Sequence, residues 1–234
     1  MSDSKVYKDL VKFWENAFKI SEDDKNEILN EMKEDDYKSL APSAKLIRAV
    51  EELHDLNNVL DYGCGSGWAS IICAKKNSFV TSVDVTESSL ELLKLYSNVF
   101  NVNDKINIIK IDSSWLKGEN DNKYDGIISS NVLDVLPKRM SEEIVKELYR
   151  ILKNDSYLIV GLNYYIEPNK AREAKMNIND DNELYIDGVL RLLDKSDDEW
   201  IELFSKYFNI EKLEYFAWEG EDNERRRLFY LRKK

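Results

Sequence analysis

Apolar residues near the start of the chain recur at steps of three and four. At this spacing they share one face, which predicts an amphipathic helix. The residues on that face are Val6, Leu10, Phe13, Trp14 and Phe18. Polar and acidic residues fill much of positions 21–38, and Pro42 suits the first turn of a further helix that runs to about Leu53. The pattern therefore predicts a helical cap over residues 1–54.

From Asn58 onward, short apolar runs alternate with helical segments. Such runs are typical of buried strands when turn residues follow them. The predicted strands are 59–62, 79–84, 106–111, 124–129 and 157–162, with helices at 68–76, 87–100 and 140–152. Strands that alternate with helices at the spacing of βαβ units indicate a doubly wound α/β fold, with a mostly parallel sheet and helices on both faces.

The last part of the chain departs from this alternation. After a predicted helix at 196–208, strands at 210–218 and 228–232 follow without a helix between them, which predicts an antiparallel pair at one edge of the sheet or inserted into it. Residues 164–195 form a long, mostly polar insertion after the fifth strand. Insertions of this length are usually lids or binding loops, and the alternative is a disordered surface loop. Residues 55–234 are thus predicted to form one domain with a lid-like insertion.

Composition excludes several classes of protein. Of 234 residues, 43% are hydrophobic and 34% are charged, which fits neither a membrane-spanning nor a disordered chain. The net charge of −11 argues against a nucleic-acid partner, because neutralising phosphates requires clustered Lys and Arg. The run Arg225–Arg227 is expected to be the solvated start of the last strand. No apolar run is long enough to form a membrane-spanning helix, so no membrane partner is expected. Two cysteines, Cys64 and Cys73, form no CxxC pair and favour a reducing cytoplasm.

A cluster of glycines follows the first predicted strand. Gly63, Gly65 and Gly67 stand between that strand and a helix, where residues without Cβ atoms let a ligand lie against the backbone, near free helix N–H groups. Trp68 occupies the position at which the dinucleotide fingerprint G-x-G-x-x-G needs its last glycine, which argues against a nicotinamide-dependent oxidoreductase. Asp84 ends the second strand beside this turn, where it would either accept the hydroxyls of a ribose or cap the next helix.

The glycine motif and three later segments resemble one family. D-x-G-x-G-x-G after a strand, with an acidic residue at the end of the next strand, resembles the class I S-adenosylmethionine-dependent methyltransferases of the Rossmann-like, small-molecule type. Residues 111–113, 124–133 and 152–157 are similar to later motifs of that family in the same order, although the last segment lacks the Pro and Gly common in relatives. The resemblance covers residues 58–162 and implies a seven-stranded sheet with a reversed last strand.

The resemblance also implies the cofactor, S-adenosyl-L-methionine, and the residues that hold it. The glycines would cradle its amino acid end with Asp61 beneath them, Asp84 would take the ribose, and Asp112 with Ser113 would take the adenine. Asn131 would line the floor between cofactor and acceptor. The full set of expected cofactor-binding residues is Asp61, Gly63, Gly65, Gly67, Asp84, Val85, Asp112, Ser113 and Asn131.

Methyl transfer from a sulfonium is a direct displacement, so positioning the acceptor supplies much of the catalysis. A general base is needed only for an acceptor that arrives protonated. Asp134, just past the fourth strand, is the candidate for orienting or deprotonating an acceptor, and its alternative role is that of a solvated turn residue. His54, the one histidine, precedes the first strand at the opposite end of the sheet. No His, Cys and Asp cluster has metal-ligand spacing.

The expected acceptor is a small molecule. Aromatic residues outside the predicted core of the sheet are the candidates for its walls, and ordinary packing is the alternative for each. These candidates are Trp14, Tyr164, Tyr165 and Tyr185. A protein acceptor, and a methyltransferase-like module that binds cofactor without catalysis, remain open at this point.

Overall fold

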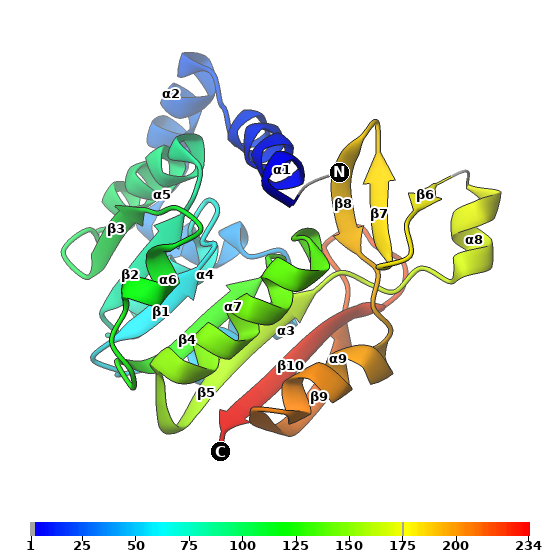
Figure 1. Cartoon of the computed structure of the whole chain (residues 1–234). Helices are drawn as coiled ribbons and strands as arrows, with labels where there is room; N and C mark the ends of the chain where they lie inside the picture. Colours follow the sequence, from blue (N-terminus) through cyan, green and yellow to red (C-terminus); the bar gives the residue numbers. More distant parts are fainter. Residues whose placement is uncertain (1–2, 175) are drawn as a thin grey trace.

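Seven strands form one sheet in the order β3-β2-β1-β4-β5-β10-β9 (Figure 1). The computed structural model describes residues 3–174 and 176–234. The strands are β1 (Val59–Tyr62), β2 (Val80–Asp84), β3 (Ile106–Lys110), β4 (Tyr124–Ser130), β5 (Leu152–Leu162), β9 (Phe208–Phe216) and β10 (Arg226–Lys233). The first five run parallel, whereas β10 is antiparallel to both β5 and β9. The predicted Rossmann-like sheet with a reversed last strand is therefore confirmed.

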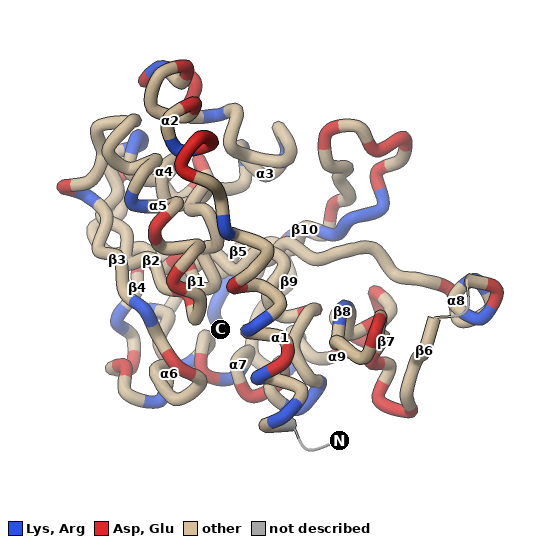
Figure 2. The backbone as a smooth tube through the Cα atoms, turned by 90° about the horizontal axis from the view of Figure 1, so that it is seen from above, with Lys and Arg blue, Asp and Glu red and all other residues tan. Residues whose placement is uncertain are grey.

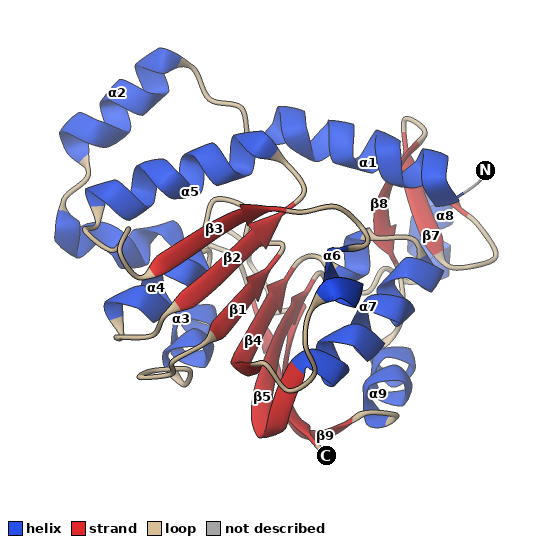
Figure 3. Ribbon diagram, turned by 60° about the vertical axis from the view of Figure 1, so that its left-hand side comes forward, coloured by secondary structure: helices blue, strands red, loops and turns tan. Residues whose placement is uncertain are grey.

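Helices cover both faces of the sheet (Figure 3). One face carries α3 (Ala44–Glu51), α4 (Trp68–Lys75) and α5 (Glu87–Val99), and the other carries α6 (Trp115–Gly118), α7 (Lys138–Ile151) and α9 (Asp197–Ser205). The remaining N-terminal elements are α1 (Asp3–Ala17), α2 (Glu22–Glu31) and η1 (Glu34–Leu40). Helix α1 crosses the end of the sheet at which the parallel strands terminate, as the predicted cap would, while α3 packs into the sheet domain. The division of the chain at residue 54 remains a prediction.

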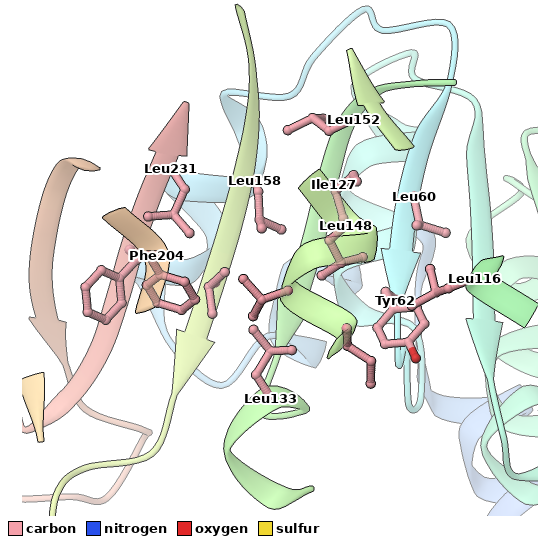
Figure 4. Packing of buried hydrophobic residues seen from close by; sticks show 14 of the residues in the cluster. Leu60, Tyr62, Leu116, Ile127, Leu133, Leu148, Leu152, Leu158, Phe204 and Leu231 are labelled. Carbon is pink, nitrogen blue, oxygen red and sulfur yellow. The ribbon is translucent and has the colours of Figure 1, made fainter. Parts of the chain in front are cut away.

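Alternate residues of each central strand serve the two helical layers. In β1, Val59 belongs to the apolar cluster beneath α3 and α4, and Leu60 to the cluster beneath α7 and α9. Figure 4 shows the second cluster, in which Leu60 and Leu158 of the sheet lie among Leu148 of α7 and Phe204 of α9. Because both faces of the sheet are buried, its strands are the continuous apolar runs that the sequence shows.

The start of β10 is buried, contrary to the expectation of a solvated run. Arg226 is 6% exposed and Arg227 is 1% exposed, and only Arg225 lies at the surface among the three. The reason is the position of β10 between β5 and β9, which flank it on both sides. Arg227 is accommodated because its guanidinium donates to the carbonyl groups of Asn163 and Lys195, at 2.8 and 2.7 Å.

The insertion at 164–195 has structure of its own. It contains α8 (Pro168–Glu173) and a three-stranded antiparallel sheet of β6 (Asn177–Ile178), β7 (Glu183–Ile186) and β8 (Val189–Leu193). Strand β8 contacts α1 and the short helix η2 (Leu133–Val135). The guanidinium of Arg191 lies 3.9 Å from the ring centroid of Phe13 on α1. The insertion therefore braces the helix that crosses the end of the sheet.

Helix α1 is also fastened to the start of α5. The carboxylate of Glu15 accepts hydrogen bonds from the backbone N–H groups of Glu87 and Ser88, at 2.8 and 3.3 Å, and the Ser88 hydroxyl donates to the Glu15 carbonyl at 2.7 Å. Thr86, at the N-cap of α5, uses its own hydroxyl elsewhere. A residue of α1 thus satisfies free N–H groups that a local cap usually satisfies.

Charged residues of both signs are interspersed along the helices and loops (Figure 2). The net charge of the sequence is −11. No helix in the described part of the chain is long and apolar enough to cross a membrane.

Gly67 offers a direct test of packing at the start of α4. Its φ is +86°, and a Cβ placed there would lie 2.1 Å from Cδ1 of Leu93, whereas Gly188 has φ +78° with open space around it. Both Gly→Ala variants should lose about 1–2 kcal/mol of unfolding free energy through left-handed strain. Gly67→Ala should lose more, because the methyl group also overpacks the core. Urea denaturation measures both, and equal losses would contradict this packing.

Candidate functional site

A cavity of about 410 Å³ lies at the carboxyl ends of the parallel strands, beneath α1. It brings together most of the residues expected to hold the cofactor. Those that line it are Asp61, Gly63, Gly65, Asp84, Val85, Ser113 and Asn131. Helix α1 supplies the opposite wall with Tyr7, Leu10, Val11 and Trp14, and Phe18 directly after the helix adds to it. Two of the expected residues, Gly67 and Asp112, do not line it.

The glycine turn is shaped by contacts that exclude side chains. The N–H groups of Gly63 and Cys64 both donate to the Val83 carbonyl of β2, at 2.9 and 3.0 Å, which folds the chain back over the sheet. Gly63 has φ +71°, and a Cβ there would lie 2.3 Å from Cγ2 of Val132. The turn therefore presents backbone to the cavity, as a cradle for a ligand requires.

Asp61 is a buried carboxylate beneath this turn. It is 3% exposed, and its Oδ2 accepts hydrogen bonds from the N–H and the hydroxyl of Ser70, at 3.0 and 2.6 Å. Burial raises its pKa to about 6, against the lowering effect of the Ser70 hydrogen bonds, and the negative charge of Asp84 adds to the rise. The charge beneath the turn thus changes within a unit or two of neutral pH.

Asp84 connects the glycine turn to α5. One carboxylate oxygen accepts from the Gly65 N–H at 3.0 Å, and the other accepts from the N–H and hydroxyl of Thr86 at 2.9 and 2.7 Å. Its side chain is buried yet lines the cavity, so the capping role seen here leaves the ribose role possible. Nearby, Tyr7 of α1 has its pKa raised to about 12, first by burial and then by the charges of Asp84 and Asp112. Tyr7 therefore enters the cavity as a neutral hydroxyl.

Asn131 follows β4 in a left-handed conformation, with φ +57°. Its N–H donates to the Gly161 carbonyl at 2.8 Å, and its Oδ1 accepts from the Ser130 hydroxyl at 3.3 Å. Its Nδ2 is buried and has no hydrogen-bond partner in the described structure, although the residue lines the cavity. A buried donor without a partner is costly, so this amide is a candidate for contact with a ligand.

Asp112 and Asp134 lie outside the cavity. Asp112 is exposed, and its carboxylate accepts from the N–H and hydroxyl of Ser114 at 2.8 and 2.6 Å, which lowers its pKa. Asp134 is fully buried, and its Oδ2 accepts from the N–H and side-chain amide of Asn163. Burial raises the pKa of Asp134. Asp134 is thus neither a solvated turn residue nor a side chain turned toward the cavity, because it orients Asn163 at the end of β5.

The aromatic candidates separate into two groups. Trp14 lines the cavity, whereas Tyr164, Tyr165 and Tyr185 do not. The Tyr164 ring lies against Arg225, whose guanidinium is 4.3 Å from its centroid, and the Tyr185 hydroxyl donates to Glu183 at 2.8 Å. The insertion contacts α1 and η2, which lie next to the site, but none of its described residues lines the cavity.

One wall of the cavity comes from a segment that the sequence did not single out. Trp218, in the loop between β9 and β10, lines the cavity together with Leu40 and Pro42 from the N-terminal segment. No motif marks these residues, and only the folding of distant segments brings them together. The His54 side chain is exposed in front of β1, at the opposite end of the sheet from this site.

Comparisons with known proteins agree with this geometry. Residues 59–155, from β1 into β5, match the family model described as a methyltransferase domain. An S-adenosylmethionine-dependent methyltransferase from Methanosarcina mazei shares 18% identity, with a TM-score of 0.61 over 76% of this chain and 92% of its own. A protein from Pyrococcus horikoshii shares 19%, with a TM-score of 0.66 over 88% and 93%.

A third similar structure contains bound ligands. It is the 1,6-didemethyltoxoflavin-N1-methyltransferase of Burkholderia thailandensis, with 1,6-didemethyltoxoflavin and S-adenosylhomocysteine, at 14% identity and a TM-score of 0.60 over 80% of this chain and 78% of its own. A search of curated proteins gives no match.

The family match and the fold agree with each other. Residues 59–155 match a methyltransferase domain, and the sheet has the Rossmann-like fold of solved S-adenosylmethionine-dependent methyltransferases.

The raised pKa of Asp61 predicts how stability depends on pH. Between its ordinary value near 4 and about 6, the folded state binds more protons than the unfolded state, so stability should fall as pH rises through this window. The loss assigned to Asp61 is on the order of 2–3 kcal/mol and is complete above the folded-state pKa. Asp61→Asn keeps an acceptor oxygen for Ser70 and removes the titration, so the variant should gain stability relative to the wild type as pH rises.

Urea denaturation from pH 4 to pH 8 measures this effect. Burial also raises the pKa of Asp194 to about 6, and this residue does not line the cavity. Asp194→Asn is therefore a matched variant, which should remove a different part of the pH dependence of the unfolding free energy. Parallel curves for the wild type and Asp61→Asn would show that Asp61 does not titrate in this range.

Proposed function

We propose that this protein is an enzyme that uses S-adenosylmethionine as its cofactor and transfers the methyl group to a small-molecule acceptor by direct displacement, mainly through positioning. The observation that carries the proposal is a single cavity in which the glycine turn, Asp84 and the free amide of Asn131 face apolar walls from α1. Polar groups thus gather on the side of the strand ends, and the cavity has apolar surface beyond them for a second molecule.

The residues present fit the cofactor on their own geometry. In this proposal the backbone at Gly63 and Gly65 holds its amino acid end, Asp84 accepts its ribose hydroxyls, and Ser113 lies on the adenine side. The unpartnered Nδ2 of Asn131 is a donor available to either ligand. The cofactor supplies an activated methyl group and departs as a neutral thioether.

The walls of the cavity exclude water and hold the acceptor. Trp14 of α1 and Phe18, which follows the helix, shield the space above the glycine turn, and Phe18 lies 3.1 Å from the position of a Cβ on Gly65. None of the described cavity-lining residues is His, Lys or Arg, and the Tyr7 hydroxyl stays protonated at neutral pH. The proposal therefore assigns no general base. An acceptor whose attacking atom is nucleophilic without first losing a proton suits this site best.

Other roles follow from the positions of the remaining candidates. Asp134 is proposed as a positioning residue, because it contacts Asn163 and not the cavity. Tyr164, Tyr165 and Tyr185 are proposed to act only through the insertion that braces α1. A small-molecule acceptor is favoured over a protein because α1 covers the cavity. A cytoplasmic location is also proposed, since both cysteines are free and buried.

Asp84→Asn tests the cofactor assignment. The variant retains the size of the side chain but loses the charge that would accept the ribose hydroxyls, so the affinity for S-adenosylhomocysteine should fall by about 10- to 100-fold. Calorimetric titration measures the dissociation constant, and thermal melting confirms folding. Asp112→Asn is the matched control, because its exposed carboxylate is occupied by Ser114. An unchanged dissociation constant in Asp84→Asn would refute the ribose assignment, and an equal loss in Asp112→Asn would show that the resemblance locates the adenine contact better than the cavity does.

A further inference from the structure

We propose that Trp218 is the residue that determines acceptor specificity, and that the acceptor is an uncharged, planar aromatic molecule that stacks on its indole ring. The inference rests on the proposed function, because it assigns the chemistry of the second ligand in the same cavity. It concerns a residue outside the methyltransferase domain match, on the loop between β9 and β10.

One face of the Trp218 indole is covered by Arg226, and the residue also lines the cavity. The guanidinium carbon of Arg226 lies 3.3 Å from the ring centroid, a distance at which it must sit over the face of the ring. Trp218 lines the cavity, whereas Arg226 does not. Because Arg226 occupies one face of the ring, the proposal assigns the opposite face to the acceptor.

Arg226, which covers one face of the Trp218 ring, is itself held by hydrogen bonds to other side chains. Both carboxylate oxygens of Glu221 accept from Arg226, at 2.6 and 2.8 Å, and Glu221 also accepts from the backbone N–H of Trp218 at 2.9 Å. Arg226 donates further to the side-chain carbonyl of Asn163, which Asp134 orients. This chain of contacts links a buried carboxylate to the cavity wall, so the aromatic surface is ordered before a ligand arrives.

The loop is also fastened to the N-terminal segment. The Glu219 N–H donates to the Pro42 carbonyl at 3.1 Å, and Lys45 pairs with Glu224 at 2.6 Å. Pro42 itself lines the cavity beside Trp218. The wall thus has two independent attachments, and neither involves the residues proposed to hold the cofactor.

Charge decides which ligand this wall suits. The acidic residues that line the cavity are Asp61 and Asp84, and the described lining holds no Lys, Arg or His to balance an anionic acceptor. A cation is disfavoured at the ring as well, because Arg226 already occupies the electron-rich face opposite. With anions and cations both disfavoured, an uncharged aromatic ring is the ligand that offset stacking on Trp218 stabilises most. Trp14 and Phe18, with centroids 6.1 Å apart, extend the aromatic surface from α1.

Three bicyclic probes of similar size separate these possibilities: 2-naphthol, its carboxylated analogue 6-hydroxy-2-naphthoic acid, and the saturated analogue decahydro-2-naphthol. Each is titrated calorimetrically into the full-length protein saturated with S-adenosylhomocysteine. We expect 2-naphthol to bind at least about tenfold more tightly than either analogue, since only it is both planar and uncharged. Equal binding of the carboxylated or saturated analogue would overturn the assignment of acceptor class.

Variants then locate the effect. Trp218→Ala should weaken 2-naphthol binding by about tenfold, and Trp218→Phe should keep most of it, because a phenyl ring also stacks. Phe79→Ala, an exposed aromatic at the opposite end of the sheet, is the matched control and should change nothing. Undiminished binding in Trp218→Ala would overturn the role of Trp218. If the wild type fails to bind S-adenosylhomocysteine at all, the proposed function fails; if it binds the nucleoside but shows no preference among the probes, only this inference fails.

Discussion

The buried carboxylate of Asp84 is the interaction on which the arrangement of the site depends. A charge with 8% of its residue exposed is tolerated only when hydrogen bonds compensate it, and three donors from two separate segments do so. One of them fixes the glycine turn and two fix the first turn of α5. Because Glu15 of α1 is bonded to that same turn of α5, the helix covering the cavity is positioned by the end of β2 as well. The glycine turn and helix α1, on opposite sides of the cavity, are thus both positioned through Asp84 and the start of α5.

The two ends of the cavity are built in different ways. The end assigned to the cofactor consists of backbone and short polar side chains at the ends of neighbouring parallel strands, where the strand order 3-2-1-4 brings them together. The end assigned to the acceptor consists of large aromatic side chains from α1 and from the loop after β9. The hydrogen bonds that shape the glycine turn and hold Asp84 involve none of these aromatic side chains.

The sequence predicted what local patterns determine. Strands β1 to β4 appear within one or two residues of their expected bounds, because each is a buried run ended by turn residues. The glycine turn and Asp84 were located for the same reason. Strand β5 begins five residues earlier than expected, because Leu152 pairs with Tyr124 of β4 ahead of a register irregularity, and the residues between Leu152 and Tyr157 are mostly polar.

What the sequence could not show depends on contacts between distant segments. Arg226 and Arg227 look like a surface run, yet both are buried because β10 is inserted between β5 and β9. Three short strands inside the insertion gave too little periodicity to be recognised. Trp218 had no motif around it, and its place on the cavity follows from its contacts with Arg226 and with the segment at Pro42.

The order of strands in the sheet has a consequence for synthesis of the protein. Strand β9 leaves the ribosome before β10, yet its hydrogen-bonded neighbour in the sheet is β10 and not β5. Until β10 has emerged, β9 has no strand to pair with, and the loop that carries Trp218 cannot be closed. The parallel half of the sheet, by contrast, has all its strands available once β5 is made. The polar end of the cavity, which the parallel strands build, can therefore form first, and the aromatic wall that carries Trp218 forms only after β10 has paired with β5 and β9.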